Sequence, residues 1–411
     1  MRDKFLPFSP LSIGEDEIGE VVDTLRSDWI TTGPKVKRFE DQFAQFVGAP
    51  DALAASSGTA ALHLALLALG IGPGDAVITT PLTFCSCVHV IEHVGARPVL
   101  VDVEPDTLNL NPRGVRRQIE KVQSDFSLRV KAILPVHLYG HPCDRDAILE
   151  IARQYGLAVI EDAAHALPAT YRGRLIGSLS SSDAVPVLTC FSFYATKNLT
   201  TAEGGMLTGP NQLLEEARRW SLHGMSRDAW KRYGSNGSWF YDVVCPGYKY
   251  NMTDIQAALG LHQLNKLPQF HARRREIVHR YQAAFRSDGV FVELPTERTD
   301  VQHAWHLYVL RLKLDNTRIG RDQFISEMRH RNIGCSVHFI PIHLHRYYRE
   351  KYGYRPEDFP VALREYQRIV SLPLSPCMSD GDVNDVISAV ADILRRGRIA
   401  ESRRPTDFAN V

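Results

Sequence analysis

The sequence lacks an excess of charge of either sign. Its 411 residues include 48 Lys and Arg against 47 Asp and Glu, which gives a formal net charge of +1. Proteins that bind the phosphate backbone of nucleic acids normally carry a basic excess or a basic stripe, whereas the charges here are scattered. The composition therefore predicts that nucleic acid is not a partner.

Long apolar runs are absent as well. The most apolar stretch, residues 53–71, is interrupted by Ser56, Ser57, Thr59 and His63, so it falls short of the roughly 18 apolar residues of a membrane helix. The N-terminal residues MRDKFLPFSPLS contain charges and prolines where a signal peptide has an apolar core. We therefore expect no membrane partner and a cytoplasmic location.

The chain has only seven cysteines, at irregular spacing. Cys85 and Cys87 form one C-x-C pair, and no C-x-x-C pair occurs, which argues against a disulfide framework or a structural zinc site. Three histidines in the stretch VHFIPIHLH, namely His338, His343 and His345, do not have a standard metal-ligand spacing. The sequence therefore predicts no bound metal.

What is present is an alternation of β-rich runs with helical patterns between about residues 50 and 210. The runs cover residues 75–83, 96–104, 130–140, 157–166 and 190–198. Such alternation, with nearly continuous apolar strands, predicts an α/β fold in which a mostly parallel sheet lies between helices. Ligands of these sheets usually bind at the carboxyl ends of the strands.

The pattern changes after residue 253. We expect helical material over 254–285 with a break at Pro268, an alternating strand over 305–314, and helices near 321–332 and 380–396. At about 150 residues per domain, the length allows two or three domains. We predict a large domain over 1–255 and a smaller α+β domain over 256–411, with the last fifteen or so residues loosely ordered.

Three groups of polar residues follow apolar runs. Residues 56–61, SSGTAA, precede a helical pattern and make either an ordinary N-cap or an anion site suited to a phosphate. Asp162 and His165 follow the run that begins at residue 157. Asp162 either caps a helix or holds a ligand ring nitrogen in its protonated form. Lys197, the only lysine between Lys131 and Lys231, is either a solvated surface group or an amine nucleophile.

Together these groups are what pyridoxal 5'-phosphate (PLP) requires from a protein. The sequence resembles the DegT/StrS family of nucleotide-sugar aminotransferases, which have the aspartate-aminotransferase-like fold type I. The resemblance runs from about residue 10 to residue 395. It is carried by SSGTAALHLALLALGIGPGDAVITTPLTF, EDAAHALPATYRG, FSFYATKN, EGGM and GYKYNMTDIQAALGLHQL.

The resemblance implies a role for each residue around the cofactor ring. Lys197 would form the Schiff base with PLP, and Asp162 would pair with the pyridinium nitrogen. His165 would hydrogen-bond near the ring hydroxyl, where many relatives have Gln. Phe84 matches the aromatic residue that stacks on the ring.

The phosphate and the subunit arrangement are implied in the same way. Gly58, Thr59 and Ser192 match phosphate-binding positions. The GYKYNM segment resembles one that reaches the phosphate of the neighbouring subunit, which implies a homodimer with shared active sites. Because many relatives have GYNYRM there, either Lys249 or Asn251 would make the contact.

Five residues are expected at the cleft for the sugar nucleotide: Trp29, Thr31, Thr32, His338 and His343. Trp29 has a plain core position as its alternative. The sequence departs from the family in a longer link over 180–190 and in Ala202, where Gly is common.

The implied activity is amination of a nucleotide-linked keto-deoxysugar, foremost a 4-keto-6-deoxyhexose, with glutamate as amino donor. Aminotransferases for a carbon-3 ketosugar or a cyclitol are the enzyme alternatives. A non-catalytic regulator that binds PLP or a sugar nucleotide on the same scaffold is the alternative from another class.

Overall fold

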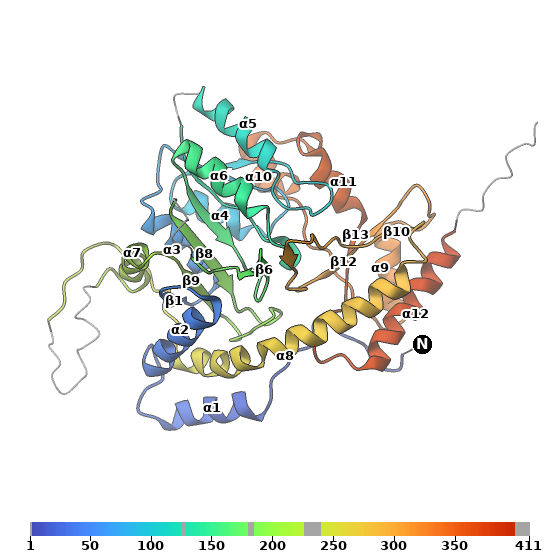
Figure 1. Cartoon of the computed structure of the whole chain (residues 1–411), viewed down its shortest axis with the longest axis horizontal. Coiled ribbons are helices and arrows are strands. Elements are labelled where there is room, and N and C mark those ends of the chain that lie inside the picture. The colour runs from blue at the N-terminus through green and yellow to red at the C-terminus, as the bar shows by residue number, and fades with distance from the viewer. Residues whose placement is uncertain (1, 125–127, 180–184, 226–239, 399–411) are drawn as a thin grey trace, which may run out of the picture.

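The structure, a computed structural model, describes residues 2–124, 128–179, 185–225 and 240–398 (Figure 1). Its α-helices are α1 (Glu15–Arg26), α2 (Pro34–Val47), α3 (Gly58–Ala68), α4 (Ser86–His93), α5 (Pro112–Gln123), α6 (Arg145–Tyr155), α7 (Asn211–Ser221), α8 (Asp254–Phe285), α9 (Arg321–His330), α10 (Arg346–Tyr352), α11 (Pro360–Arg368) and α12 (Asp380–Arg396). Its strands are β1 (Ala52–Ala55), β2 (Asp75–Thr79), β3 (Arg97–Leu100), β4 (Arg129–Ile133), β5 (Ala158–Asp162), β6 (Thr170–Tyr171), β7 (Arg174–Leu175), β8 (Val187–Ser192), β9 (Gly205–Thr208), β10 (Val292–Glu293), β11 (Val301–Gln302), β12 (Tyr308–Leu312) and β13 (Ile369–Leu372).

The main sheet has seven strands in the order β1-β9-β8-β5-β4-β2-β3. Strands β3, β2, β4, β5 and β8 pair in parallel, whereas β9 is antiparallel to both β8 and β1. The predicted α/β fold with a mostly parallel sheet is confirmed. The carboxyl ends of β2, β5 and β8 consequently lie at one edge, where β1 also ends.

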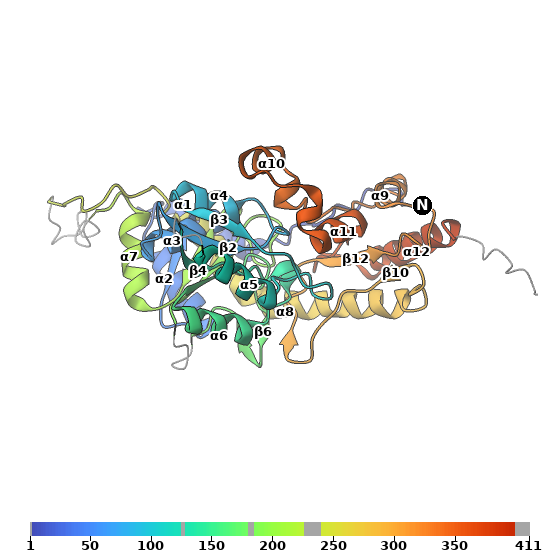
Figure 2. The ribbon, with the colours of Figure 1, turned by 90° about the horizontal axis from the view of Figure 1, so that it is seen from above.

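Helices cover both faces of this sheet (Figure 2). On one face, α3 and α4 pack against alternate strand residues such as Ile160 and Leu188. On the other face, α5 and α6 pack against the intervening residues, among them Ile133 and Val159. Because successive side chains of a strand point to opposite faces, strands buried on both sides are apolar at nearly every position.

The predicted helix break at Pro268 is wrong, because α8 runs through this proline without interruption. A proline inside a helix costs about 3 kcal/mol through its missing N–H and its steric clash. Packing on both sides of Pro268 offsets this cost, since Leu264, Leu267 and His271 are buried. The helix contacts α1, α2 and α12 and extends from the main sheet to the C-terminal region (Figure 1).

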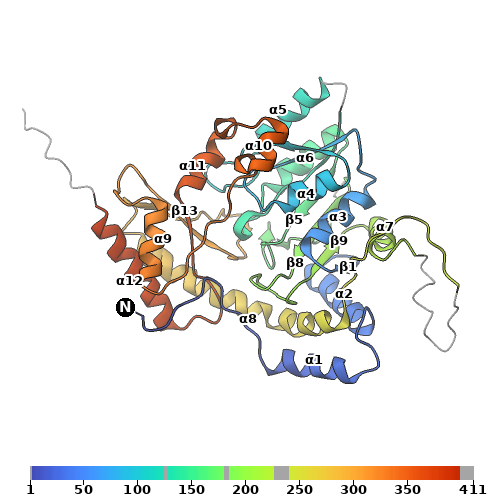
Figure 3. The same ribbon diagram turned by 180° about the vertical axis from the view of Figure 1, so that it is seen from behind.

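The C-terminal region contains a second sheet in the order β10-β12-β13. The chain's N-terminal residues lie beside this region, where Leu6 pairs with Ile333. Helix α10 lies instead against the main-sheet unit, where Glu92 of α4 accepts hydrogen bonds from Tyr347 and Tyr352. Helix α11 contacts both parts, because its Val361 and Ala362 N–H groups donate to Asp102 and it packs on β12 (Figure 3). The predicted division at residue 255 stays a prediction.

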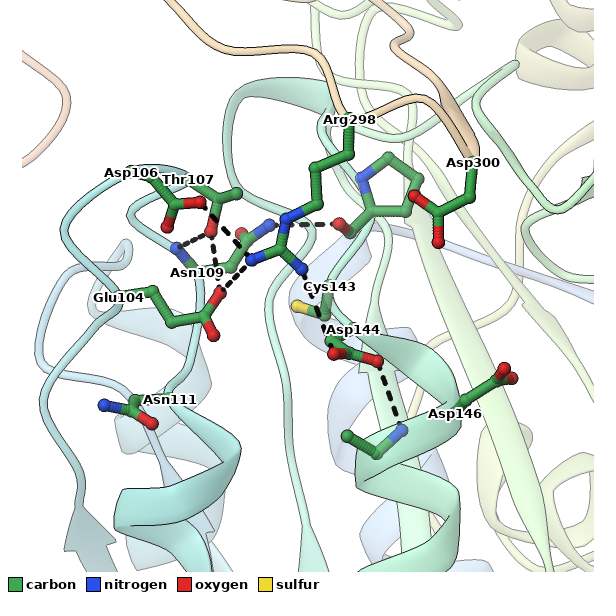
Figure 4. Close-up of polar contacts among 12 residues, drawn as sticks. Glu104, Asp106, Thr107, Asn109, Asn111, Cys143, Asp144, Asp146, Arg298 and Asp300 are labelled. Carbon is green, nitrogen blue, oxygen red and sulfur yellow. Dashed lines mark hydrogen bonds and ion pairs between the residues drawn. The ribbon is translucent and has the colours of Figure 1, made fainter.

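Arg298 joins the two regions through an ionic contact (Figure 4). Its Nη2 atom lies 2.7 Å from Oε2 of Glu104 and 3.5 Å from Oδ2 of Asp106. Its Nη1 atom lies 3.9 Å from Oδ2 of Asp144, at the start of α6. These contacts fix the segment that leads into β11 and β12 against the main sheet unit.

Parts of two expectations fall outside the described residues. They are the longer link, of which residues 180–184 are not described, and the loosely ordered tail, of which 399–411 are not described. Among the helices that the structure does describe, none has the length and apolarity needed to cross a membrane.

Candidate active site

A cavity of about 480 Å³ lies where the carboxyl ends of β1, β2, β5 and β8 meet. The segments after these strands contribute Gly58, Phe84, Asp162 and Lys197 to its lining. His306 and other residues of the C-terminal region close it from the other side. The cavity therefore unites residues that are more than 240 positions apart in the sequence.

One wall of the cavity is the N-terminus of α3. Ser57 caps this helix, because its Oγ atom accepts a hydrogen bond from the Ala60 N–H at 3.0 Å. The N–H groups of Gly58 and Thr59 have no partner within the helix, and the helix dipole is positive at this end. A Cβ atom on Gly58 would lie 2.7 Å from the Cβ atom of Ser192, so only glycine permits this close approach. The result is a cradle for an anion between α3 and β8.

Asp162, the last residue of β5, offers a carboxylate whose orientation is fixed. Its Oδ1 atom accepts a hydrogen bond from the Ala164 N–H at 2.9 Å. Its Oδ2 atom accepts one from the Cys87 thiol at 2.8 Å. Burial and the neighbouring Asp162 raise the pKa of Cys87 well above its ordinary value, so the thiol keeps its proton. Asp162 is 6% exposed, and it lines the cavity.

Lys197 follows β8 and extends into the same cavity. Burial lowers the pKa of its amine to about 8, although the carboxylate of Asp162 opposes this shift. An amine with this pKa is neutral in an appreciable fraction of molecules near neutral pH. Lys197 therefore combines nucleophilic and basic character with a position beside Asp162.

His165 presents an N–H group to the cavity. Its Nδ1 atom accepts a hydrogen bond from the Tyr139 N–H at 3.2 Å. Burial lowers the pKa of His165 well below its ordinary value, and the Lys197 amine adds to this effect. The ring is therefore neutral with its proton at Nε2, and it is a hydrogen-bond donor toward a bound group.

Phe84 and His338 also line the cavity. Phe84 is 57% exposed, and its ring lies 5.9 Å from that of Phe339. The backbone carbonyl of His338 accepts a hydrogen bond from the Tyr139 hydroxyl. His338 Nδ1 lies 2.8 Å from the Ser371 hydroxyl. The contacts with Phe84 and Tyr139 hold the segment that carries His338 and Phe339 against the main-sheet unit, and the contact with Ser371 holds it to β13 of the second sheet.

Five predicted residues do not line this cavity: Trp29, Thr31, Thr32, Lys249 and Asn251. Four of them meet in a separate group near the start of α8. Asn251 Nδ2 donates to Thr32 Oγ1 at 2.6 Å, and Trp29 Nε1 donates to the Thr32 carbonyl at 2.8 Å. The Thr31 carbonyl accepts from the Asp254 N–H, and Lys249 is exposed.

His343 does not line the cavity either. Its side chain is fully buried, and its ring centroid lies 4.8 Å from that of Phe359. Its Nε2 atom lies 3.2 Å from the carbonyl oxygen of Pro356. A ring packed in this way has no free face for a substrate, which argues against the predicted contact.

The residues around the cavity fit PLP. Phosphate suits the anion cradle at α3, where Thr59 and Ser192 add hydroxyl groups. A protonated ring nitrogen suits Asp162, and an aldehyde suits the amine of Lys197. Among the described residues we find no group of three or more His, Cys, Asp or Glu placed to hold a metal ion.

Sequence reasoning missed Cys87, His306 and Phe339. Cys87 was considered only as part of a C-x-C pair, and His306 lies in a run interpreted as a strand. His306 is 5% exposed. It lines the cavity, as does Phe339. No spacing rule would single out these two residues, because the packing of the C-terminal region brings them to the site.

Comparisons with known proteins agree with this chemistry. A model described as the DegT/DnrJ/EryC1/StrS aminotransferase family matches residues 11–391. Spore coat polysaccharide biosynthesis protein SpsC of Bacillus subtilis (strain 168) is 52% identical over 396 residues, which are 96% of this chain and 98% of SpsC.

Solved structures of similar chains point the same way. The putative sugar aminotransferase Spr1654 from Streptococcus pneumoniae, in its PLP form, is 35% identical with a TM-score of 0.84, covering 95% of this chain and 99% of Spr1654. DesV from S. venezuelae is 31% identical with a TM-score of 0.82, covering 95% of this chain and 100% of DesV. Spr1654 is also known in a PMP form.

These matches confirm the predicted fold, the aminotransferase class and, at the level of the family, the PLP cofactor. The family match spans nearly the whole chain and agrees with the resemblance found in the sequence. The chain belongs to the DegT/DnrJ/EryC1/StrS aminotransferase family.

Proposed function

We propose that this protein transfers the amino group of glutamate to the ketone of a nucleotide-linked 4-keto-6-deoxyhexose. The observation that carries the proposal is the convergence of Lys197, Asp162 and the N-terminus of α3 on one cavity. The naming of Spr1654 as a putative sugar aminotransferase and of SpsC for polysaccharide biosynthesis supports a sugar substrate. The choice of carbon 4 rests on the GYKYNMTDIQAA segment, which resembles that branch of the family.

Bound PLP supplies an electron sink and a carbonyl group that carries nitrogen between the two substrates. Thr59, Ser192 and the free N–H groups of α3 would hold its phosphate. Asp162 would keep a proton on the ring nitrogen, because its fixed carboxylate stabilises the positive charge there. His165 would donate its Nε2–H to the ring oxygen.

Lys197 performs the proton transfer in this proposal. In its neutral form the amine would take a proton from the α-carbon of glutamate and pass it to the cofactor, and in the second half-reaction a proton would return by the same route to the carbonyl carbon of the sugar. A pKa of about 8 permits both transfers near neutral pH. The half-buried amine lies in a cavity with the neutral imidazoles of His165 and His338.

We further propose a homodimer in which each active site receives residues from both copies. Among the described residues that line the cavity, Lys197 is the only Lys or Arg, so this lining offers the phosphate dianion no second cationic side chain. Lys249 is exposed and outside the cavity of its own chain, and Asn251 lies near it. On α1 the apolar residues Ile18 and Leu25 are 47% and 58% exposed, as expected of a surface that a second copy covers.

The seven unpaired cysteines support a cytoplasmic location, because reduced thiols are typical of that compartment. We include this location in the proposal.

The substrate is tested by an amination screen. The holoenzyme is incubated with glutamate and, in separate reactions, nucleotide-linked 4-keto and 3-keto sugars and a cyclitol ketone, with Lys197→Ala as control. We expect amination of the 4-keto sugar at the highest kcat/KM. Preference for a 3-keto sugar or a cyclitol would correct the substrate. No turnover of any ketone, with PLP bound, would favour the regulator.

A further inference from the structure

His306 is a buried histidine of the cavity for which the family resemblance implied no role. It lies two residues before β12 (Tyr308–Leu312) and is 5% exposed. It lines the cavity together with Lys197 and Asp162. The hydrogen bonds of a buried polar side chain decide which of its atoms remain available to a ligand.

Asn198 fixes the position of the proton on His306. The Nδ2 atom of Asn198 donates to the carbonyl oxygens of Leu167 at 2.9 Å and Ala304 at 3.0 Å. Because both partners only accept, the amide orientation is settled and Oδ1 of Asn198 faces Nδ1 of His306 at 3.2 Å. An amide oxygen has no proton to give, so Nδ1 of His306 carries the hydrogen.

The Nε2 atom of His306 is consequently a bare acceptor. Burial lowers the pKa of this ring well below its ordinary value, and His165 and Lys197 add to the effect, so the ring is neutral. Within the described part of the chain, Nε2 has no hydrogen-bond partner. This nitrogen is not among the fully buried atoms that lack a partner, and its residue lines the cavity, so it is available to a hydrogen-bond donor bound there.

The ring is held rigidly in this orientation. Arg274 of α8 donates from Nη1 to the backbone carbonyls of Trp305 and His306, each at 3.3 Å. The ring centroid of His306 lies 4.4 Å from that of His165. An acceptor that is fixed in place loses little entropy when it binds a donor, as in a preorganised site.

We propose that His306 binds the sugar substrate, with its bare Nε2 atom accepting a hydrogen bond from a hydroxyl group of the ketosugar. This inference rests on the proposed function. The two carboxylates of glutamate do not suit the position, because they only accept hydrogen bonds, and its amino group is the one that reacts with the cofactor. A sugar hydroxyl is a donor and matches the bare nitrogen. His165 also lines the cavity, and its protonated Nε2 donates a hydrogen bond. The two imidazoles therefore select different partners, since His306 binds a donor and His165 binds an acceptor.

The test separates the two half-reactions of the holoenzyme by their change in visible absorption. The PLP form is mixed with glutamate, and the pyridoxamine form is mixed with a nucleotide-linked 4-keto-6-deoxyhexose. His306→Asn keeps a donor toward Asn198 and removes Nε2, whereas His306→Gln places an amide oxygen within reach of the Nε2 position. Unchanged thermal stability and cofactor spectrum serve as the control for folding.

We expect His306→Asn to slow the sugar half-reaction about tenfold, equivalent to one lost hydrogen bond, with the glutamate half-reaction within about twofold of wild type. His306→Gln should recover part of the loss. Equal slowing of both half-reactions, or no change in either, would overturn the inference. Failure of the proposed function is distinguishable, because wild-type enzyme would then aminate none of the ketosugars.

A second measurement does not depend on turnover. Nitrogen NMR of holoenzyme with labelled histidines, assigned with the His306→Asn variant, distinguishes a protonated from a bare ring nitrogen. We expect Nδ1 protonated and Nε2 bare at pH 7, with Nε2 shifting when the ketosugar is added. A protonated Nε2 or an unshifted signal in the presence of saturating ketosugar would overturn the assignment.

Discussion

The thiol of Cys87, on α4, donates a hydrogen bond to Oδ2 of Asp162 across 2.8 Å. Thr83 Oγ1 lies 3.2 Å from the same sulfur. Because Asp162 already accepts the only thiol proton, the Thr83 hydroxyl donates to the sulfur. The resulting series of two hydrogen bonds, from Thr83 to Cys87 and from Cys87 to Asp162, stabilises the negative charge of Asp162 and orients its carboxylate.

Replacing Cys87 with valine removes this donor and adds about one methyl group at a fully buried position, so unchanged thermal stability must be shown first. The carboxylate of Asp162 then loses a hydrogen bond worth about 1.5 kcal/mol, so we expect kcat to fall about tenfold and the absorption of the bound cofactor to shift. Cys87→Ser keeps a donor and serves as the matched control. Equal kcat values for the valine and serine variants would show that the thiol does not act through Asp162.

Asp162→Asn should keep the shape of the site but remove the charge that stabilises a protonated ring nitrogen. We expect kcat to fall by a factor equivalent to about 2–5 kcal/mol, as for truncating a buried charge pair. In this background Cys87→Val should have little further effect, because the two residues act on one charge. Additive losses in the double variant, or full activity of Asp162→Asn, would contradict this role.

The lowered pKa of Lys197 predicts how the apoprotein captures PLP at different pH values. Only the neutral amine attacks the aldehyde, and below a pKa of about 8 its fraction falls about tenfold per pH unit. The rate of capture, followed by visible absorption, should therefore rise with pH and level off above about 8. A lysine-containing peptide is the control, and its rate should rise to about pH 10. If the rate for the protein had the same pH dependence as the rate for the peptide, the lowered pKa of Lys197 would be ruled out.

A shared active site predicts complementation between two inactive variants. One variant carries Lys197→Ala, and the other carries both Lys249→Ala and Asn251→Ala. In a mixed dimer one site has both lesions and the other has neither. Random pairing makes about half of the dimers mixed, so about a quarter of wild-type activity should return on co-expression. With mixed dimers and folding demonstrated, no recovery would mean that the segment acts within its own subunit.

Much of the site could be predicted from the sequence, because its residues follow the ends of apolar strands. Asp162 ends β5, Lys197 follows β8, and residues 56–61 lie between β1 and α3. In a parallel sheet those ends meet at one edge, so the residues had to lie close together. The apolar run next to each residue in the sequence therefore showed that the residue lies at the end of a strand.

The rest depends on contacts between distant segments. Cys87 and Asp162 are separated by 75 positions, and His306 and Asn198 by 108. No periodicity encodes such pairs, since they arise when whole elements pack. The break expected at Pro268 was wrong for the same reason, because the buried face of α8 outweighs a local preference.

The most direct test of the account is the turnover of Lys197→Ala in ketosugar amination with glutamate. The variant must first be shown to bind pyridoxamine phosphate, which establishes that the site is folded. With the nucleophile and proton carrier removed, kcat should fall by about three orders of magnitude or more. Turnover within about tenfold of wild type would contradict the account, because another group would then carry the amino transfer.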